Sequence, residues 1–360
     1  MKTTIVSREY WNVLKGVGIV FVVLGHMNTP FSNFIYLFHM PLFFFISGYL
    51  YNEEKYGDNS YALLVSKIKS SWMKYVYINW AFILLHNVFY KYGFLEATAK
   101  AYSLKTLCKQ MSLALFAAND TQLLIGPLWF VPTSVIASVI LALIVQFSRR
   151  IQAREVYSIN KYIVQTILVC ICTLFGYFCA KKGIRMVAEM QISFLVMPWL
   201  WAGYLLRNLR VSFEKYLNPI VAIVCAVLIF VANMYYELEL VLFMKVYPLM
   251  YFVAFMGIYM CMYLAKLFLS IPRVKTIFEY SGEASFVIMA SHFGLYRVFD
   301  WILSQLLCKE DPISKYLELP NSFPEIWPAY IIIGFVLPLS IYVLWGKLKE
   351  RVGYEKANLK

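Results

Sequence analysis

The sequence predicts an all-α integral membrane protein, folded as a bundle of about ten transmembrane helices. Hydrophobic residues make up 61% of the 360 residues and charged residues only 15%, against about 45–50% and about 25% in soluble domains. The mean hydropathy of +0.64 agrees with this composition. Apolar stretches of about 20 residues, enough to cross a bilayer, recur along the whole chain. We therefore expect residues 1–360 to form a single membrane-embedded domain.

The expected spans follow from the apolar runs in chain order. The first run is interrupted by Lys15 and lacks a small-residue cleavage site, so it predicts a retained helix rather than a signal peptide. The sixth run is short for a span. The ten expected helices cover about 11–29, 33–51, 72–90, 127–147, 162–180, 191–206, 218–235, 246–269, 285–306 and 327–345.

Three connections between these spans have features of their own. Residues 52–71 are polar and predict a cytoplasmic loop. Residues 100–118 carry apolar side chains at helical spacing, which predicts an amphipathic helix on the outer face. The long outer connection 309–328 is rich in proline and acidic residues. Two interpretations of it stay open, a lid that faces substrate and an ordinary solvated connector.

The net charge of +13 raises the question of nucleic acid as a partner. With the N-terminus in the cytoplasm, however, 22 of the 33 Lys and Arg residues fall on the cytoplasmic side, whereas the acidic residues divide evenly. This bias is what the positive-inside rule predicts. We therefore expect a multi-pass protein of the cell inner (plasma) membrane, with both termini cytoplasmic, the lipid bilayer as a partner and no nucleic acid.

Histidines inside the apolar runs are the first candidates for chemistry. Of four histidines, His39, His86 and His292 lie within apolar runs, and His26 lies near the end of the first. An ionisable group is costly in a membrane, so such positions indicate function or a hydrogen-bonded structural role. His86 shares a helix face with Asn79, a pairing more typical of contacts between helices than of catalysis.

Lys15 and His26 are predicted to share one face of the first helix. They are eleven residues apart, which is about three turns and about 16 Å along the axis. Lys15 would face the cytoplasmic end, where it either binds an anionic substrate or anchors the helix in the lipid headgroups. His26 would lie at the outer end, followed by Asn28 and Thr29.

His39 is predicted to lie at a similar depth to His26. It stands two residues before Pro41, and a proline removes a helical hydrogen bond, which leaves a carbonyl to be satisfied by nearby groups. A neutral imidazole accepts a proton near pH 7, so two of them at one depth suit a base and a group that orients substrate. The alternative is a structural histidine. The seven cysteines form no CxxC motif, and we expect neither a metal site nor a disulfide.

Several segments resemble one known family of membrane proteins. The first two helices contribute the most specific motifs, and a Leu-Trp-Phe segment and a late Ser…His helix add weaker ones. Together they make the chain similar, nearly end to end, to the acyltransferase-3 family, and most of all to its fucose 4-O-acetylase-like group. The segments are Leu14–Gly16, Leu24–His26, Phe38–Tyr49, Pro127–Phe130 and Tyr280–His292.

This resemblance implies a membrane O-acyltransferase, most simply an O-acetyltransferase. It would move an acyl group from cytoplasmic acetyl-CoA or another acyl-CoA to a hydroxyl of a surface glycan or lipid-linked sugar. The implied catalytic residues are His26 and His39. The implied donor-binding residues are Lys15, Ser47 and Trp129, and the implied acceptor-binding residues are Asn28 and His292. The family commonly has Arg where Lys15 stands, and Lys keeps the charge but not the bidentate geometry.

Two other classes of function remain open at this level. A transporter or flippase for a glycolipid or a small anion would line its path with the same polar residues. Such proteins often contain inverted repeats, and no internal repeat is evident in this sequence. A receptor or scaffold would not need His26 and His39 at a matched depth. Transfer of label from acetyl-CoA separates these classes.

Overall fold

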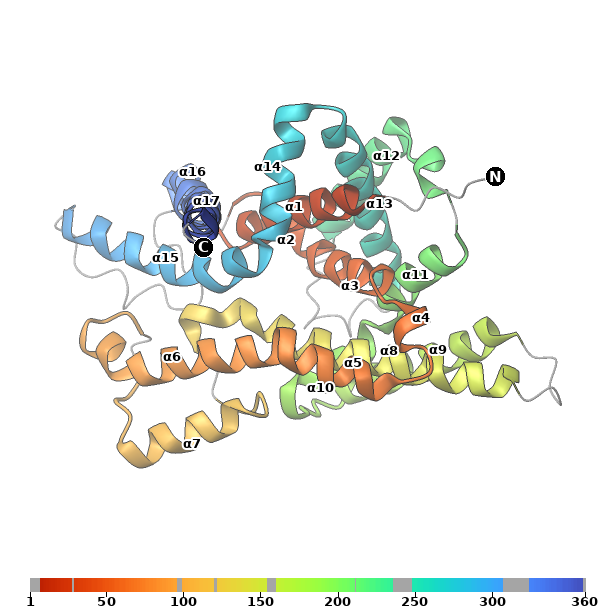
Figure 1. The fold of residues 1–360 in the computed structure, drawn as a ribbon, viewed down its shortest axis with the longest axis horizontal. Coiled ribbons are helices and arrows are strands. Elements are labelled where there is room, and N and C mark those ends of the chain that lie inside the picture. The colour runs from red at the N-terminus through yellow and green to blue at the C-terminus, as the bar shows by residue number, and fades with distance from the viewer. Residues whose placement is uncertain are drawn as a thin grey trace.

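The computed structural model describes residues 7–27, 29–95, 99–119, 122–153, 160–210, 212–235, 248–306 and 324–358. Within these ranges every regular element is a helix (Figure 1), which confirms the predicted all-α class. The α-helices are α1 Arg8–Gly25, α2 Ser32–Tyr36, α3 His39–Tyr49, α4 Glu53–Tyr56, α5 Ser60–Lys67, α6 Met73–Lys91, α7 Leu104–Ala114, α8 Phe130–Ala153, α9 Lys161–Lys181, α10 Met190–Leu195, α11 Met197–Asn208, α12 Pro219–Tyr235, α13 Leu249–Leu269, α14 Pro272–Glu283, α15 Ser285–Leu306, α16 Trp327–Ile331 and α17 Leu337–Asn358.

Five of the described helical segments are long and apolar enough to cross a membrane by themselves. The helix α12 is equally apolar but shorter. The total of about ten spans therefore stays a prediction, whereas the helical membrane class is supported. The five segments are Leu123–Ala153, Lys161–Lys181, Leu249–Leu269, Ser285–Leu306 and Trp327–Arg351.

Two of the predicted spans are broken, and a proline explains each break. Residues 33–51 were expected as one helix, but the chain forms α2 and α3 with a turn at Leu37 and Phe38. Pro41 cannot donate to the carbonyl of Leu37, four residues earlier, and its ring displaces that carbonyl. Residues 191–206 likewise divide into α10 and α11 at Val196, where Pro198 acts on the carbonyl of Phe194 in the same way.

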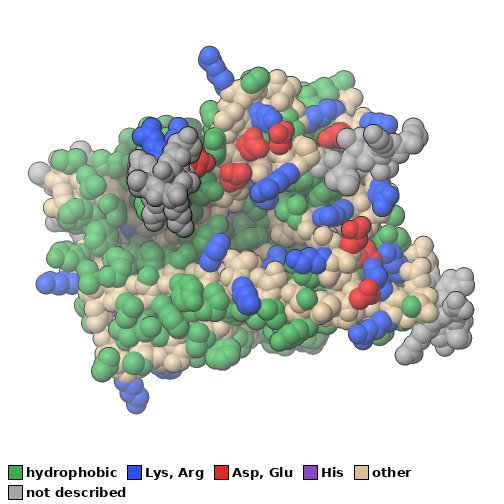
Figure 2. All heavy atoms as spheres, viewed as in Figure 1, with side chains coloured by type: hydrophobic (Ala, Val, Ile, Leu, Met, Phe, Trp, Pro, Cys, Tyr) green, Lys and Arg blue, Asp and Glu red, His purple; other side chains and the backbone are tan. Residues whose placement is uncertain are grey.

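The surface of the helices is apolar over large areas, as expected for contact with lipid. Figure 2 shows apolar side chains spread over the region of α6 and α7, while charged side chains gather over α14 and around α4. On α9, six large apolar side chains at helical spacing are exposed: Ile163, Ile167, Ile171, Leu174, Phe175 and Phe178. In a chain this apolar, such an uncovered face indicates a lipid-facing surface.

Close approaches at glycines hold α1 and α3 against their neighbours. A Cβ on Gly16 would lie 2.0 Å from the carbonyl oxygen of Phe278, and one on Gly282 would lie 1.9 Å from that of Asn12. The same reciprocal arrangement joins α3 to α11, where Gly48 and Gly203 face each other's backbones. Such pairs let membrane helices pack at short distance, and they fix the two helices that carry the candidate site.

A cluster of charges lies where several predicted cytoplasmic segments meet. Glu53 of α4 accepts hydrogen bonds from Arg149 at 3.1 Å, from Lys161 at 2.8 Å and from Tyr204 at 2.8 Å. Burial alone would raise the pKa of Glu53, but these hydrogen bonds outweigh it and lower the pKa. The cluster therefore joins residues 52–71 to the segments around Arg149 and Lys161, which the predicted topology places on one side.

The amphipathic segment forms a helix, α7, as predicted. The indole nitrogens of Trp72 and Trp80 donate to the carbonyls of Leu115 and Met111 at 2.9 and 2.8 Å. These bonds align α7 along the side of α6 (Figure 1), and its location at the outer face stays a prediction. Of the long connection 309–328, residues 309–323 lie outside the described residues, so its two interpretations stay untested.

Candidate active site

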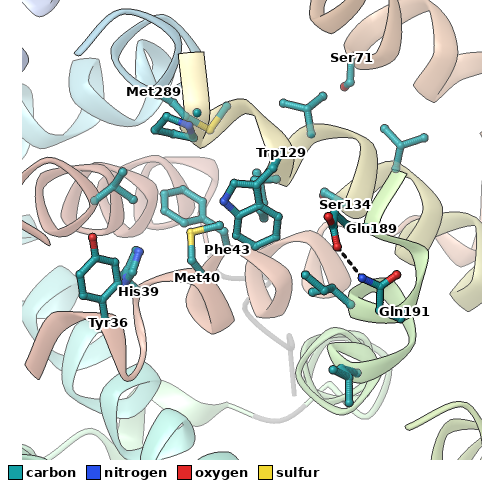
Figure 3. A pocket seen from close by; sticks show the side chains of 18 of the residues that line it. Tyr36, His39, Met40, Phe43, Ser71, Trp129, Ser134, Glu189, Gln191 and Met289 are labelled. Carbon is teal, nitrogen blue, oxygen red and sulfur yellow. Dashed lines mark hydrogen bonds between the residues drawn. The ribbon is translucent and has the colours of Figure 1, made fainter. Parts of the chain in front are cut away.

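One cavity of about 710 Å³ lies among α1, α3, the π-helical turn Ile68–Trp72 and the N-terminal part of α8. The connection from α9 to α10 and the first turns of α15 complete its wall. Most of the lining is apolar, with a small number of polar side chains (Figure 3). A largely apolar pocket with a few convergent polar groups is typical of small-molecule sites.

The helix α1 presents one face to this cavity. Ile19, Val22 and His26 follow one another at helical spacing and all line it. His26 is the residue at which the helix ends, since it caps α1 after Gly25. Lys15 lies one turn before Ile19 on the same face but does not line the cavity, and its ammonium donates to Asn12 at 3.3 Å. The predicted shared face of Lys15 and His26 is therefore present.

His39 reaches the cavity because α3 begins at this residue. The break before α3 turns its first side chains toward His26, and the centroids of the two imidazole rings lie 6.2 Å apart. The Nδ1 of His39 lies 2.9 Å from the carbonyl oxygen of Ile35. A carbonyl oxygen only accepts, so Nδ1 carries the proton and the Nε2 of the neutral ring keeps its lone pair.

The side chain of His292, on α15, contacts that of His26. Its side chain is fully buried and is not among the residues that line the cavity. Its Nδ1 lies 2.9 Å from the carbonyl oxygen of Ile288, and its Nε2 lies 3.4 Å from the Nδ1 of His26. By the same rule the Nδ1 of His292 donates to Ile288, which leaves its Nε2 to accept from the Nδ1–H of His26. The Nε2 of His26 then holds a lone pair.

Aromatic rings fix the orientation of the histidine pair. The ring of Tyr36 lies 5.8 Å from that of His26 and 5.2 Å from that of His39, and Phe293 lies 4.9 Å from His26. Edge-to-face contacts at these distances hold the imidazoles in place. Sequence reasoning did not single out Tyr36. Its position three residues before His39 was the only available signal.

The predicted donor-binding residues occupy different positions around the cavity. Trp129 lines it and lies in its centre in Figure 3. Ser47 lies one turn beyond the lining residue Phe43, to whose carbonyl its hydroxyl donates at 2.8 Å, and it does not line the cavity. Lys15 and Ser47 therefore occupy equivalent positions, since each lies one helical turn away from a residue that lines the cavity. The predicted acceptor-binding residue Asn28 lies outside the described residues.

Several polar residues of the lining were not predicted as site residues, and four of them carry a charge or an amide. Lys67, at the end of α5, was assigned to a polar loop. Arg185 and Glu189 belong to the connection between α9 and α10, and Gln191 lies in the first turn of α10. Neither motif nor spacing marks them, because they meet the cavity only through the packing of α5 and α10 against α8.

His86 does not line the cavity. Its ring stacks on Tyr102 with centroids 3.5 Å apart, and its Nε2 lies 3.1 Å from the carbonyl oxygen of Lys100. Six cysteines of the described chain are free. Among the described residues no group of three His, Cys, Asp or Glu side chains is arranged to hold a metal ion.

Comparison with known proteins places this geometry in context. A family model described as an acyltransferase domain matches residues 8–345, which is nearly the whole chain. No curated protein and no solved structure matches the chain. The match covers α1, with Lys15 and His26, and α15, with His292, so the residues gathered at the cavity all lie within the matched region.

Proposed function

The chain belongs to the acyltransferase-3 family, and on this premise we propose that it is an O-acyltransferase, most simply an O-acetyltransferase. The donor is acetyl-CoA or another acyl-CoA, and the acceptor is a hydroxyl of a surface glycan or a lipid-linked sugar. The observation that carries the proposal is the hydrogen-bond chain from Ile288 through His292 to His26, beside a cavity large enough for substrates. The fucose 4-O-acetylase-like subgroup remains a prediction.

His26 is the proposed general base. Its Nε2 takes the proton of the acceptor hydroxyl while the hydroxyl oxygen attacks the thioester carbonyl. The carbon–sulfur bond then breaks, and the CoA thiolate leaves and takes up a proton. A positioned base contributes about 10²–10⁴-fold to such a step. The thioester is already activated, so the mechanism calls for no metal.

His39 and His292 support this base in different ways. The Nε2 of His39 is left as an acceptor by the bond to Ile35, so His39 orients the acceptor hydroxyl or shares its proton. His292 was predicted to contact the acceptor, but it is fully buried. We assign it the role of a positioning residue, because its Nε2 selects the tautomer of His26 that leaves Nε2 free to act.

The donor is proposed to enter from the cytoplasmic end. Lys15 and Ser47 lie on the faces of α1 and α3 that continue from the cavity, and Lys67 adds a cation in the lining itself. CoA is anionic, so these cations attract it. Trp129 lines the cavity, where it offers an apolar surface to the acyl group. The charge cluster of Glu53 supports the topology, because it joins segments that the positive-inside rule places in the cytoplasm.

One experiment tests the proposed function. The purified protein is mixed with acetyl-CoA labelled in the acetyl group and with a panel of glycans, and label on the glycan is measured. Transfer that depends on the protein supports an O-acetyltransferase. Movement of a glycolipid across reconstituted vesicles, with the label left on CoA, would instead establish the transporter or flippase alternative.

A further inference from the structure

The connection between α9 and α10 brings a second polar group into the cavity, one that the acyl-transfer step does not use. Arg185 and Glu189 come from this connection and Gln191 from the first turn of α10, and all three line the cavity. Figure 3 shows Glu189, Gln191 and Ser134 on the far side of Trp129 from His39 and Tyr36. The predicted topology places this connection at the outer face, where a surface sugar would approach.

The carboxylate of Glu189 is held in one orientation. The side-chain nitrogen of Gln191 donates to its Oε2 at 2.5 Å, and the side-chain oxygen of Gln191 accepts from the backbone nitrogen of Met186 at 2.9 Å. Gln191 is buried, so this support is rigid. Among the described residues no donor reaches the second carboxylate oxygen of Glu189, and that oxygen remains available to a ligand.

The backbone at Glu189 is strained to achieve this placement. Ala188 and Glu189 have φ angles of 56° and 51° in the left-handed region, which residues other than glycine enter at a cost in free energy. Strain of this kind persists where the surrounding structure fixes the residue, and it clusters at ligand sites. Here it directs a carboxylate into a cavity that is otherwise mostly apolar.

We propose that Glu189, Gln191 and Ser134, with Trp129 as an aromatic wall, form the acceptor subsite, and that it takes a neutral sugar. This inference rests on the proposed function, because it assigns the acceptor of that reaction. The free carboxylate oxygen of Glu189 accepts hydrogen bonds from sugar hydroxyls, and bonds to a charged acceptor are about twice as strong as neutral ones. Trp129 offers an apolar surface to the sugar ring or to the acyl group bound next to it.

Charge gives the subsite its selectivity. The side chain of Glu189 is only partly exposed, whereas that of Arg185 is exposed, and the structure gives no ion pair between them. An exposed cation is screened by solvent and salt more strongly than a partly buried carboxylate. A uronic acid would place its carboxylate against that of Glu189, so the subsite favours uncharged sugars.

The test measures acceptor binding and acetyl transfer separately in the purified full-length protein. The probes are methyl glycosides of glucose, galactose and fucose, compared with methyl glycosides of glucuronic and galacturonic acid. Binding is measured by titration calorimetry without donor, and transfer is measured with labelled acetyl-CoA. The variants are Glu189→Gln, Glu189→Gly and Arg185→Gln, with Glu54→Gln as a matched control at an exposed position outside the cavity. Glycine suits the left-handed backbone, so Glu189→Gly removes the carboxylate without added strain.

The expected result is a 10- to 100-fold rise in the KM for the neutral glycosides in both Glu189 variants, which corresponds to about 1.4–2.8 kcal/mol. The KM for acetyl-CoA stays unchanged, and Glu54→Gln behaves as the native protein toward these sugars. Three results overturn the subsite: an unchanged acceptor KM in the Glu189 variants, a preference for acidic glycosides that Arg185→Gln abolishes, or no binding of any glycoside. Glycoside binding without acetyl transfer would instead reject the proposed function and leave the subsite standing.

Discussion

The hydrogen-bond chain behind His26 leads to a sharp prediction about His292. Replacing His292 with Leu removes the acceptor for the Nδ1–H of His26, which lies 3.4 Å away. His26 is then free to adopt either tautomer and to rotate. A hydrogen bond between neutral groups contributes about 0.5–1.5 kcal/mol, so we expect kcat to fall about 2- to 12-fold. The fall is smaller than that expected for loss of the base itself.

Glutamine provides the matched variant at this position. In His292→Gln the side-chain nitrogen is available to donate to Ile288 and the side-chain oxygen to accept from His26, so both ends of the chain of hydrogen bonds are kept. We therefore expect His292→Gln to retain most of kcat and His292→Leu to lose it, with the KM for both substrates unchanged in each.

The assay is acetyl transfer at saturating acetyl-CoA, measured across pH at equal amounts of folded protein. Thermal unfolding in detergent serves as the control, because His292 is buried and either variant loses packing. Equal losses of kcat in the Leu and Gln variants would refute the positioning role. A rise in the acceptor KM with unchanged kcat would restore the direct substrate contact that the sequence predicted.

Three further predictions concern the donor, the strained turn and the charge cluster. If Lys15 and Lys67 attract CoA, Lys15→Met and Lys67→Met each raise the KM for acetyl-CoA, whereas Lys15→Arg does not. An unchanged KM in Lys15→Met would mean that Lys15 only anchors the helix in the lipid headgroups. Ala188→Gly relieves left-handed strain and raises the free energy of unfolding by about 1 kcal/mol. A lower unfolding temperature in the variant would contradict the strain. Glu53→Gln lowers stability by about 1.5–3 kcal/mol at pH 7. Because the pKa of Glu53 is lowered in the folded protein, its contribution to the free energy of unfolding is complete above the ordinary pKa of 4.5 and is lost as the pH falls through the folded-state pKa. A difference in the free energy of unfolding between the native protein and Glu53→Gln that persists at lower pH would argue against this.

The helical class and the general region of the site were predictable from the sequence, but the internal breaks were not. Hydropathy marks an apolar run without marking where it bends, so residues 33–51 and 191–206 were expected as unbroken helices. Pro41 was noted as loosening the local backbone, yet only the structure shows that the break turns His39 toward His26. Hydropathy also could not predict the π-helical turn at Ile332–Val336, which precedes Pro338.

Residues that meet only through tertiary packing could not be derived from a single sequence. His26 and His292 are 266 positions apart, and their contact depends on α15 packing beside α1. Lys67 and Glu189 carry no motif and enter the cavity from the end of α5 and from the turn before α10. Lys15 and Ser47, by contrast, were predicted from motifs and lie one turn beyond the lining, so their role at the donor end remains a prediction.

The central claim is that His26 is the general base of acyl transfer, and one comparison tests it most directly. His26→Ala and His86→Ala are measured for transfer from acetyl-CoA at equal membrane abundance, with thermal unfolding as the control for a collapsed bundle. His86 is the matched histidine, because it is buried in helix contacts away from the cavity. We predict that His26→Ala inserts normally and loses transfer by about 10²–10⁴-fold, while His86→Ala loses much less. Near-native transfer by a well-inserted His26→Ala protein would contradict the assignment and make His39 the candidate base.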